Sequence, residues 1–316
     1  MTTNDLAQSD PNLMPLADLW AAFERSGLPR RLFELARDED LGPSATDPSA
    51  DAAGADRWAG RVVVREEGVV AGLACVPVLL SVFGSGVDFV PSAADGDRCA
   101  PGDTLGTLVG PRAAVLRVER TLLNTVGRLC GVATRTDAFV RVLRDGGGRA
   151  QLWDTRKTTP GLRLLEKYAG RCGGGMNHRL GLHDAVMLKD NHVSGGAGIA
   201  ERVGLMLDGI DASVRTGAPK PRFVEVEVDG LEQLHGLLRA HGGRIDAVLL
   251  DNMTIDQLCE AVRMRDAAGV SLQLEASGGV NLDTIGAIGV TGVDRVSVGS
   301  LTHGARSLDV GLDAEG

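Results

Sequence analysis

The pattern of apolar and polar positions divides the chain into two parts. In the first part, up to about residue 110, two helical segments and one strand-like run stand out: 16–28, 30–42 and 60–72. Short alternating segments follow without a regular repeat of strand and helix, so we expect a small α+β domain. A long helical segment from about 111 to 144 leads out of it, with a break expected near Cys130 and Gly131.

From residue 150 the pattern becomes regular, because short aliphatic runs alternate with helical segments. The six expected strands are 150–153, 185–188, 223–228, 247–250, 271–275 and 295–298. This alternation predicts a parallel sheet with right-handed crossovers, and six strands are too few for a closed barrel of eight. We therefore expect a disordered tail at 1–13, an N-terminal domain at 14–122 joined by 304–316, and an incomplete α/β barrel at 123–303.

Polar residues follow all six expected strands at their C-terminal ends. They are Asp154–Lys157, Lys189–His192, Glu227, Asp251–Asn252, Ser277–Gly279 and Gly299–Ser300. In βα barrels the active site lies on that face and takes residues from several strands. The alternative is that these are ordinary loop residues, but the agreement of all six strands favours a site.

The composition narrows the classes of partner. The net charge is −9 and aromatic residues make up 3% of the chain, which argues against a nucleic acid or an anionic membrane surface as partner. Five cysteines without a CxxC pair predict neither a disulfide framework nor a zinc site, and favour a cytoplasmic location. The first residues do not resemble a signal peptide, and no run of 18 apolar residues predicts a membrane span.

One segment is basic within this acidic chain. Residues 151–192 contain seven Lys or Arg and four acidic residues, which indicates an anionic ligand such as a phosphate or a carboxylate. Arg156, Lys157 and Lys189 directly follow apolar strands, so a binding role suits them. Three other residues of the segment are expected on a solvated helix face: Glu166, Lys167 and Arg171.

Two further groups suggest chemistry. His178 and Arg179 follow three glycines, and together they could hold a carboxylate, although a lone histidine is more often structural. In the strand at 223–228 the side chains of Glu225 and Glu227 share one face, which in a barrel is the lumen. Glu227 and Asp251, at neighbouring strand ends, could bind Mg²⁺, stabilise a cationic transition state or form structural ion pairs.

Ungapped words along the chain, taken together, resemble quinolinate phosphoribosyltransferase. The words are Glu119-Arg-Thr-x-x-Asn124, Asp154-Thr-Arg-Lys-Thr-Thr-Pro-Gly161, Gly173-Gly-Gly-x-Asn-His-Arg179, Lys189-Asp-Asn-His192, Glu225-Val-Glu227, Leu250-Asp-Asn-Met253, Glu275-Ala-Ser-Gly-Gly279 and Val298-Gly-Ser-Leu-Thr-His303. The resemblance implies an N-terminal open α/β sandwich, a C-terminal incomplete α/β barrel, and a homodimer or an assembly of dimers. It also implies an enzyme of NAD biosynthesis that converts quinolinate and phosphoribosyl pyrophosphate to nicotinate mononucleotide, carbon dioxide and pyrophosphate, with Mg²⁺.

The same resemblance implies roles for individual residues. The catalytic residues would be Lys157, Lys189, Glu227 and Asp251, of which Glu227 and Asp251 would also lie near the metal. Arg156, His178 and Arg179 would bind the carboxylates of quinolinate, and Arg120 would reach into the site of the partner subunit. The 5′-phosphate side would consist of Ser277, Gly278, Gly279, Gly299 and His303. The loop at 208–222 is expected to be a surface insertion.

Three other functions remain open. A paralogue associated with molybdenum transport shares the fold, but it lacks the complete set of Asn177-His178-Arg179 and Lys189–His192. A Schiff-base aldolase would use Lys157 or Lys189 as nucleophile, and the arginine cluster argues against it. A catalytically inactive barrel that only binds a ligand is the remaining alternative, although the charged residues of the motifs are all present.

Overall fold

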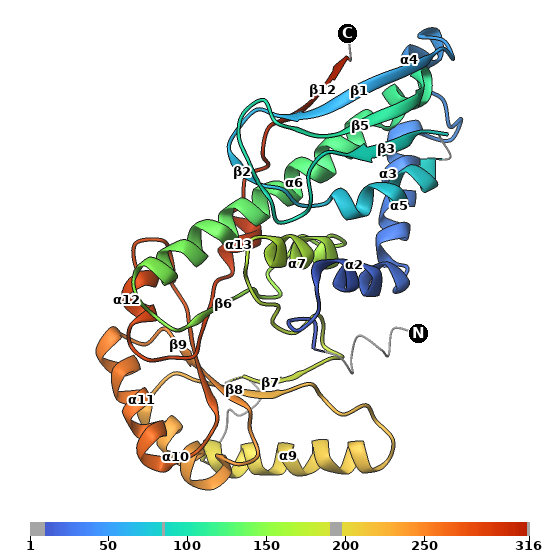
Figure 1. Ribbon diagram of the computed structural model, residues 1–316. Coiled ribbons are helices and arrows are strands. Elements are labelled where there is room, and N and C mark those ends of the chain that lie inside the picture. The colour runs from blue at the N-terminus through green and yellow to red at the C-terminus, as the bar shows by residue number, and fades with distance from the viewer. Residues whose placement is uncertain (1–9, 84–85, 190–197, 315–316) are drawn as a thin grey trace.

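The computed structural model describes residues 10–83, 86–189 and 198–314. Figure 1 shows two domains connected by the long helix α6 (Arg112–Asp145), with both the first helices and the C-terminal strand in the upper domain. Within the described residues, no helix combines the length and the apolar character needed to cross a membrane. All five cysteines are free, and four of them are buried.

The N-terminal domain combines an antiparallel sheet with helices. Its helices are α2 (Leu16–Arg25), α3 (Leu28–Leu41), α4 (Pro48–Ala52), η1 (Leu73–Cys75) and α5 (Val76–Phe83). Its strands are β1 (Arg57–Val64), β2 (Gly68–Val69), β3 (Asp88–Pro91), β4 (Arg98–Cys99), β5 (Thr104–Pro111) and β12 (Val310–Ala314). Four of the strands form a sheet in the order β12-β1-β5-β3, and β2 pairs with β4. The two predicted helices are confirmed, whereas the predicted run at 60–72 is divided between β1 and β2.

Helix α6 continues without the break predicted near Cys130 and Gly131. The glycines of this helix do not kink it but allow the C-terminal segment of the chain to pass close to the helix backbone. A Cβ atom at Gly131 would lie 1.9 Å from the carbonyl oxygen of Arg306, and one at Gly127 would lie 2.7 Å from that of Leu308. The C-terminal segment therefore crosses the helix backbone where no side chain intervenes.

The same helix contributes to two separate hydrophobic cores. Its residues up to Ala133 belong to the core of the N-terminal domain, and those from Phe139 on belong to the core of the barrel. The predicted boundary between residues 122 and 123 falls inside this continuous helix. Leu308 and Val310 lie in the N-terminal core, and β12 pairs with β1, so the end of the described chain packs with the first domain.

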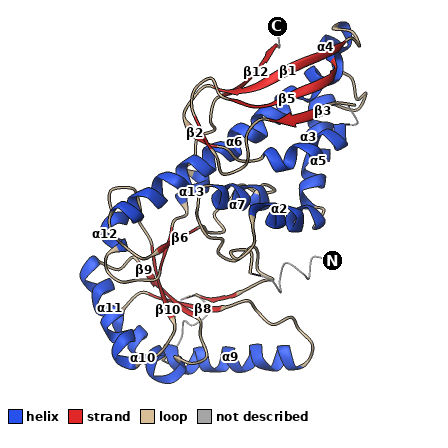
Figure 2. Cartoon of the chain, in the orientation of Figure 1, coloured by secondary structure: helices blue, strands red, loops and turns tan. Residues whose placement is uncertain are grey.

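The barrel domain alternates parallel strands with outer helices. Its strands are β6 (Gln151–Trp153), β7 (Val186–Leu188), β8 (Val224–Val228), β9 (Ala247–Asp251), β10 (Gln273–Ser277) and β11 (Arg295–Ser297). Its helices are α9 (Ile199–Arg215), α10 (Leu231–His241), α11 (Ile255–Ala268), α12 (Ile285–Gly289) and α13 (Ser300–His303), whereas α7 (Arg163–Cys172), which follows β6, packs its buried residues into the N-terminal core. All six predicted strands are present, and Figure 2 shows helices α9 to α12 outside the strands.

The sheet stays open, as an incomplete barrel requires. Its order is β6-β11-β10-β9-β8-β7, so β6 and β7 are its edge strands. Among the described residues, the sheet continues beyond β6 through a single parallel bridge between Trp153 and Met176. The predicted loop at 208–222 lies on the surface as expected, but its first half is helical, because α9 extends to Arg215.

Helix α7 corrects one sequence prediction. Glu166 and Lys167 are fully buried, not solvated, because α7 packs against α6 and α2. Glu166 accepts hydrogen bonds from Arg128 at 2.6 Å and from the Thr159 backbone at 2.9 Å. Lys167 donates to Asp154 at 2.5 Å, so both buried charges have a partner, as burial requires.

Residues 10–13 form a turn that is held in place. They belong to the segment that the sequence predicts to be a disordered tail, of which residues 1–9 lie outside the described residues. Asn12 forms hydrogen bonds with the backbone of Asn177, and Asp10 forms an ion pair with Arg222. This part of the tail is ordered because it packs on the barrel.

Candidate active site

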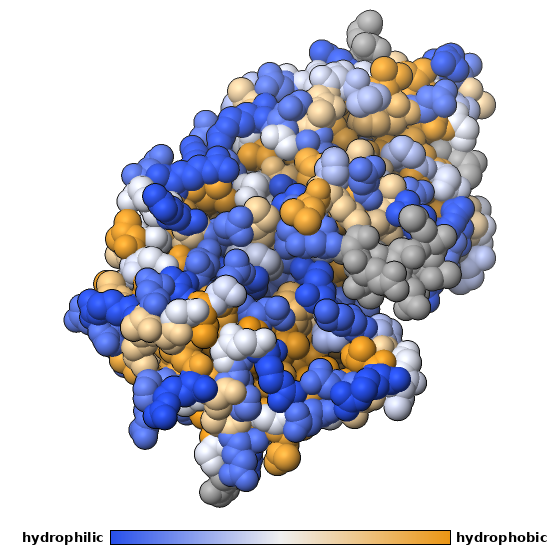
Figure 3. Space-filling model, turned by 60° about the horizontal axis from the view of Figure 1, so that its bottom comes forward, coloured by the Kyte–Doolittle hydropathy of each residue, from blue (hydrophilic) through white to orange (hydrophobic). Residues whose placement is uncertain are grey.

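A cavity of about 710 Å³ lies at the C-terminal ends of the barrel strands. Its walls come from the ends of all six strands and the loops that follow them, as predicted from the polar residues in the sequence. The lining includes Arg156, Lys157, His178, Arg179, Lys189, Glu227, Asp251, Glu275, Ser277, Gly278, Gly279, Gly299 and His303. Figure 3 shows hydrophilic residues gathered around a hollow on one face of the molecule.

Two arginines form the cationic side of this cavity. Arg179 is 9% exposed, and burial together with the nearby Arg156 guanidinium lowers its pKa. Within the described residues, no acid lies within salt-bridge distance of either guanidinium, and the Nε atom of Arg156 is buried without a hydrogen-bond partner. Two such cations close together favour an anionic ligand between them, and their planar donors suit carboxylates.

Lysines and acids share the mouth of the cavity. Lys189 forms an ion pair with Glu227 at 2.7 Å, at the ends of adjacent strands β7 and β8. Asp251 ends β9, and its carboxylate accepts a hydrogen bond from the side chain of Asn252 at 2.9 Å. Lys157 is exposed and lies against Gly299, whose hypothetical Cβ would be 2.7 Å from the lysine Cδ.

Small residues form the part of the wall at the ends of β10 and β11. Gly278 has φ of +93°, and a Cβ there would lie 2.2 Å from the Oδ1 atom of Asn252, so only glycine fits. Ser277, Gly279 and His303 complete this wall. The absence of side chains at both glycines leaves backbone N–H groups accessible, which suits a phosphate group.

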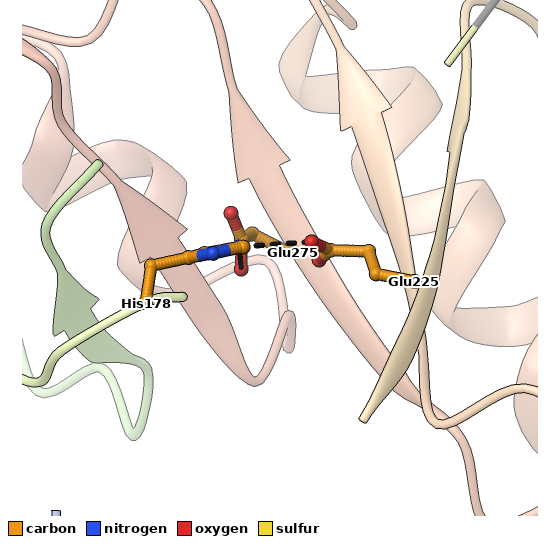
Figure 4. A group of neighbouring side chains, drawn as sticks. All are labelled: His178, Glu225 and Glu275. Carbon is orange, nitrogen blue, oxygen red and sulfur yellow. Dashed lines mark hydrogen bonds and ion pairs between the residues drawn. The ribbon is translucent and has the colours of Figure 1, made fainter. Parts of the chain in front are cut away.

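The floor of the cavity is a buried cluster that involves His178. In Figure 4, His178, Glu225 and Glu275 point toward one another from a loop and from strands β8 and β10. The Nε2 atom of His178 lies 2.8 Å from Glu225 Oε2 and 3.6 Å from Glu275 Oε2. Beneath the cluster, the Arg295 guanidinium lies 4.0 Å from the centre of the Trp153 ring.

The two glutamates of the floor differ in protonation. Burial and the adjacent Glu225 carboxylate raise the pKa of Glu275 to about 7. Burial acts in the same direction on Glu225, but His178 and Arg295 outweigh it and lower the pKa of Glu225. The Glu225 and Glu275 carboxyl groups lie within 4.8 Å of each other. Two buried carboxyl groups this close cannot both ionise freely, so the pair retains one proton in weakly acidic solution.

His178 uses both ring nitrogens within the protein. Its Nδ1 accepts a hydrogen bond from the Arg179 backbone at 2.8 Å, so the ring proton lies on Nε2 and is directed to Glu225. Burial lowers the pKa of His178, but Glu275 and Glu225 outweigh this effect and raise it.

The same geometry bears on metal binding. Within the described part of the chain, His178, Glu225 and Glu275 are the one group of three or more potential metal ligands whose ligand atoms lie within 4.8 Å of one another. A metal on Nε2 of His178 would require an unprotonated nitrogen there while Nδ1 also acts as an acceptor. A neutral imidazole cannot satisfy both, so we interpret the cluster as a hydrogen-bonded floor.

A second buried network supports the backbone that carries His178. The carboxylate of Asp154 accepts hydrogen bonds from Lys167 at 2.5 Å, from the Asn177 side chain at 2.9 Å and from the His178 backbone at 2.8 Å. Asp154 is only 3% exposed, so it anchors the site and does not face a substrate. The sequence grouped it with the polar residues of the active-site face.

Some predicted residues lie outside the cavity, and some lining residues were not predicted. Arg120 lies on α6 with its side chain 67% exposed and does not line the cavity of its own chain. Residues 190–192 of the predicted Lys189–His192 motif lie outside the described residues. Glu275 was quoted only as part of a motif, although its position two residues before Ser277 on β10 places it on the lumen face.

Comparison with known proteins gives a consistent assignment. Models of the N-terminal and C-terminal domains of quinolinate phosphoribosyl transferase match residues 49–130 and 132–313. The nicotinate-nucleotide pyrophosphorylase (carboxylating) of Mycobacterium leprae is 44% identical over 256 residues, 80% of this chain and 85% of that protein. A probable enzyme of the same name from Bacillus subtilis is 38% identical over 252 residues, 80% and 82% of the two chains.

A solved structure agrees in fold. The nicotinate-nucleotide pyrophosphorylase of Francisella tularensis superposes with a TM-score of 0.81 at 31% identity, covering 97% of this chain and 99% of that one. The matching domain models cover most of the chain, and the relative from Mycobacterium leprae exceeds 30% identity over most of both proteins. The chain therefore belongs to the quinolinate phosphoribosyl transferase family.

Proposed function

We propose that the protein converts quinolinate and phosphoribosyl pyrophosphate to nicotinate mononucleotide, carbon dioxide and pyrophosphate. The observation that supports this most is the pair Arg156 and Arg179, two neighbouring guanidiniums in a cavity that is also lined by glycines at the ends of β10 and β11. A ligand with carboxylates at one end and a phosphate at the other suits this arrangement. The names of the relatives agree with it.

Arg156 and Arg179 are the residues that bind the pyridine carboxylates in this proposal. Because no described acid forms an ion pair with either guanidinium, substrate binding does not compete with an internal ion pair. His178 contributes the floor beneath the pyridine ring and fixes the backbone of Arg179, because its own nitrogens are engaged. We therefore assign His178 a positioning role, in place of the direct carboxylate contact expected from the sequence.

The wall of Ser277, Gly278, Gly279, Gly299 and His303 accepts the 5′-phosphate. Glycine at 278 is required by its backbone conformation and by Asn252, and the exposed N–H groups can then approach phosphate oxygens. His303 adds an imidazole donor at the same wall. In this proposal the ribose lies between the phosphate wall and the acids Glu227 and Asp251.

Mg²⁺ is the metal that fits the donor set at the mouth. Glu227 and Asp251 offer carboxylate oxygens that face the cavity, and Mg²⁺ is commonly bound by one or two carboxylates together with substrate phosphates. When bound there, Mg²⁺ would neutralise charge on the pyrophosphate. The protein's own contribution is to hold the two carboxylates at adjacent strand ends, with Lys189 beside Glu227.

The reaction forms two bonds and breaks two. The pyridine nitrogen bonds to C1 of the ribose as the C1–oxygen bond to pyrophosphate breaks, and Glu227 and Asp251 stabilise the positive charge on the ribose. Lys157 and Lys189 stabilise the negative charge of the leaving group. The C2–carboxylate bond then breaks, carbon dioxide leaves, and C2 takes up a proton. We place transfer before decarboxylation, because the cationic nitrogen makes the C2 carboxylate easier to lose.

A turnover assay tests this function. The protein is mixed with quinolinate, phosphoribosyl pyrophosphate and MgCl₂, and nicotinate mononucleotide and carbon dioxide are measured. Equal amounts of both products are expected, and the absence of both would reject the proposal. A carbon isotope effect on free quinolinate without phosphoribosyl pyrophosphate would reject the proposed order of steps.

We also propose a homodimer in a cytoplasmic location, in which Arg120 completes the site of the partner subunit. The exposure of Arg120 on α6, outside its own cavity, supports this role. Two inactive variants, Arg120→Ala and Lys157→Ala, are mixed and allowed to exchange subunits. Hybrid dimers then contain one intact site, so activity should return to roughly a quarter of the wild-type value. No recovery, with exchange verified by mass, would show that Arg120 acts in its own subunit or not at all.

A further inference from the structure

The barrel has an open edge next to the candidate quinolinate site. On that side of β6, the backbone of Met176 completes one bridge: its N–H donates to Leu152 at 2.8 Å, and its carbonyl accepts from Asp154 at 2.9 Å. In a strand, successive residues direct their backbone groups to opposite sides. The N–H and carbonyl of Asn177 therefore point away from β6, toward the gap in the barrel.

A single side chain occupies this position. The Asn12 Oδ1 atom accepts a hydrogen bond from the Asn177 N–H at 2.6 Å, and Asn12 Nδ2 donates to the Asn177 carbonyl at 3.0 Å. The carboxamide thus satisfies both backbone groups, as a neighbouring strand would. An exposed strand edge would otherwise leave these groups to water, with a looser backbone.

A second contact from the same segment reinforces the first. Asp10 accepts hydrogen bonds from the Asn12 backbone at 3.0 Å and from Arg222 at 3.2 Å. Arg222, which precedes β8, also donates to the His178 carbonyl and to Asp184, both at 3.2 Å. The turn at residues 10–12 is therefore connected to both sides of the open edge.

This arrangement holds the backbone that presents the substrate-binding side chains. From the inside, Asp154 binds the Asn177 side chain and the His178 N–H, and from the outside Asn12 binds the Asn177 backbone. Arg179 follows directly and lines the cavity. We infer that Asn12 is a positioning residue for quinolinate binding, which acts by fixing the backbone of residues 177–179. The inference rests on the proposed function for its choice of substrate.

Steady-state kinetics of Asn12→Ala test the functional part. The loss of two hydrogen bonds at this edge should raise the KM for quinolinate roughly tenfold, while the KM for phosphoribosyl pyrophosphate and the melting temperature stay near the wild-type values. Asn12→Gln keeps both amide groups and should recover part of the affinity. The matched control is Leu13→Ala, since Leu13 is the next residue and 84% exposed. Equal increases in both KM values, or an unchanged KM for quinolinate, would overturn the inference.

Hydrogen exchange tests the structural part without any turnover. The amide of Asn177 should exchange faster in Asn12→Ala than in wild type and in Leu13→Ala, by roughly tenfold. Unchanged exchange would show that Asn12 does not hold this edge and would overturn the inference by itself. Inactivity of the wild-type protein toward quinolinate would instead reject the proposed function, and the exchange result would still report on the edge.

Discussion

Glu225 and Glu227 lie two residues apart on β8 and face the same lumen, yet their surroundings differ. Glu227 belongs to the rim of the cavity, with its side chain 14% exposed and Lys189 as its partner. Glu225 belongs to the floor, fully buried and bonded to His178. One pleat of a strand therefore separates a carboxylate available to a substrate from one that stabilises the interior. The role of each glutamate is therefore determined by its depth in the barrel and not by its residue type.

The comparison predicts that substitutions in the floor and in the rim differ in their effect on stability. The largest effect on stability is expected for Glu225→Ala, which leaves His178 and Arg295 without their buried anion and should reduce the free energy of unfolding by about 3–5 kcal/mol. The matched control is Glu227→Ala, which removes a partly exposed pair and should cost no more than about 1 kcal/mol. Urea denaturation measures both. Equal losses would remove the distinction between floor and rim.

Next in size is the effect of Arg179→Ala on substrate binding. The loss of an arginine that contacts a substrate carboxylate in a buried site costs about 2–5 kcal/mol. The KM for quinolinate should therefore rise about 30-fold or more, with little change for phosphoribosyl pyrophosphate, and Arg156→Ala should behave similarly. Lys220→Ala removes an exposed cation and serves as the control for net charge. Near-normal saturation by quinolinate would exclude a carboxylate-binding role for the tested arginine.

The substitution Glu227→Gln tests the proposed electrostatic role of the rim in catalysis. The substitution keeps the shape but removes the negative charge that stabilises the ribose cation, so kcat should fall roughly a hundredfold. The melting temperature should stay close to wild type. Glu232→Gln, an exposed neutral substitution just after β8, is the control. A normal kcat in Glu227→Gln would contradict the proposed electrostatic role.

The smallest predicted effect is a pH dependence that originates in the floor. The folded protein holds the Glu275 proton up to about pH 7, whereas the unfolded chain releases it near 4.5. Folding thus takes up a proton in this window, and the contribution of Glu275 to stability decreases as the pH rises through it. Glu275→Gln removes this cost, so its melting temperature relative to wild type should increase between pH 5 and pH 8 by a few degrees. A constant difference would show that Glu275 ionises normally.

The sequence predicts the barrel well because its signals are local. Each strand of the barrel is a short aliphatic run, and the alternation of Glu225 and Glu227 with valines is enough to identify the face that lines the lumen. Parallel strands bring their C-terminal ends to one side, so Lys189 and Asp251 could be placed in one site from their positions after the strands.

The predictions failed where burial depends on distant parts of the chain. Glu166 and Lys167 have the spacing of a solvated helix, and only the packing of α7 between α6 and α2 makes them interior. The hydrogen bond between His178 and Glu225, 47 residues away, is also not visible in the local sequence, although the predicted role of His178 stays a prediction. Likewise, Gly131 suggests a helix break, and only the crossing of the segment around Arg306 explains why a glycine lies there.

That crossing has a consequence for biosynthesis. The N-terminal sheet is completed by β12, which the ribosome makes after every strand of the barrel. Until then the outer edge of β1 has no partner, and the surface of α6 at Gly127 and Gly131 is uncovered. We therefore expect the barrel to mature first on the nascent chain and the first domain to mature last, in the reverse of their order of translation.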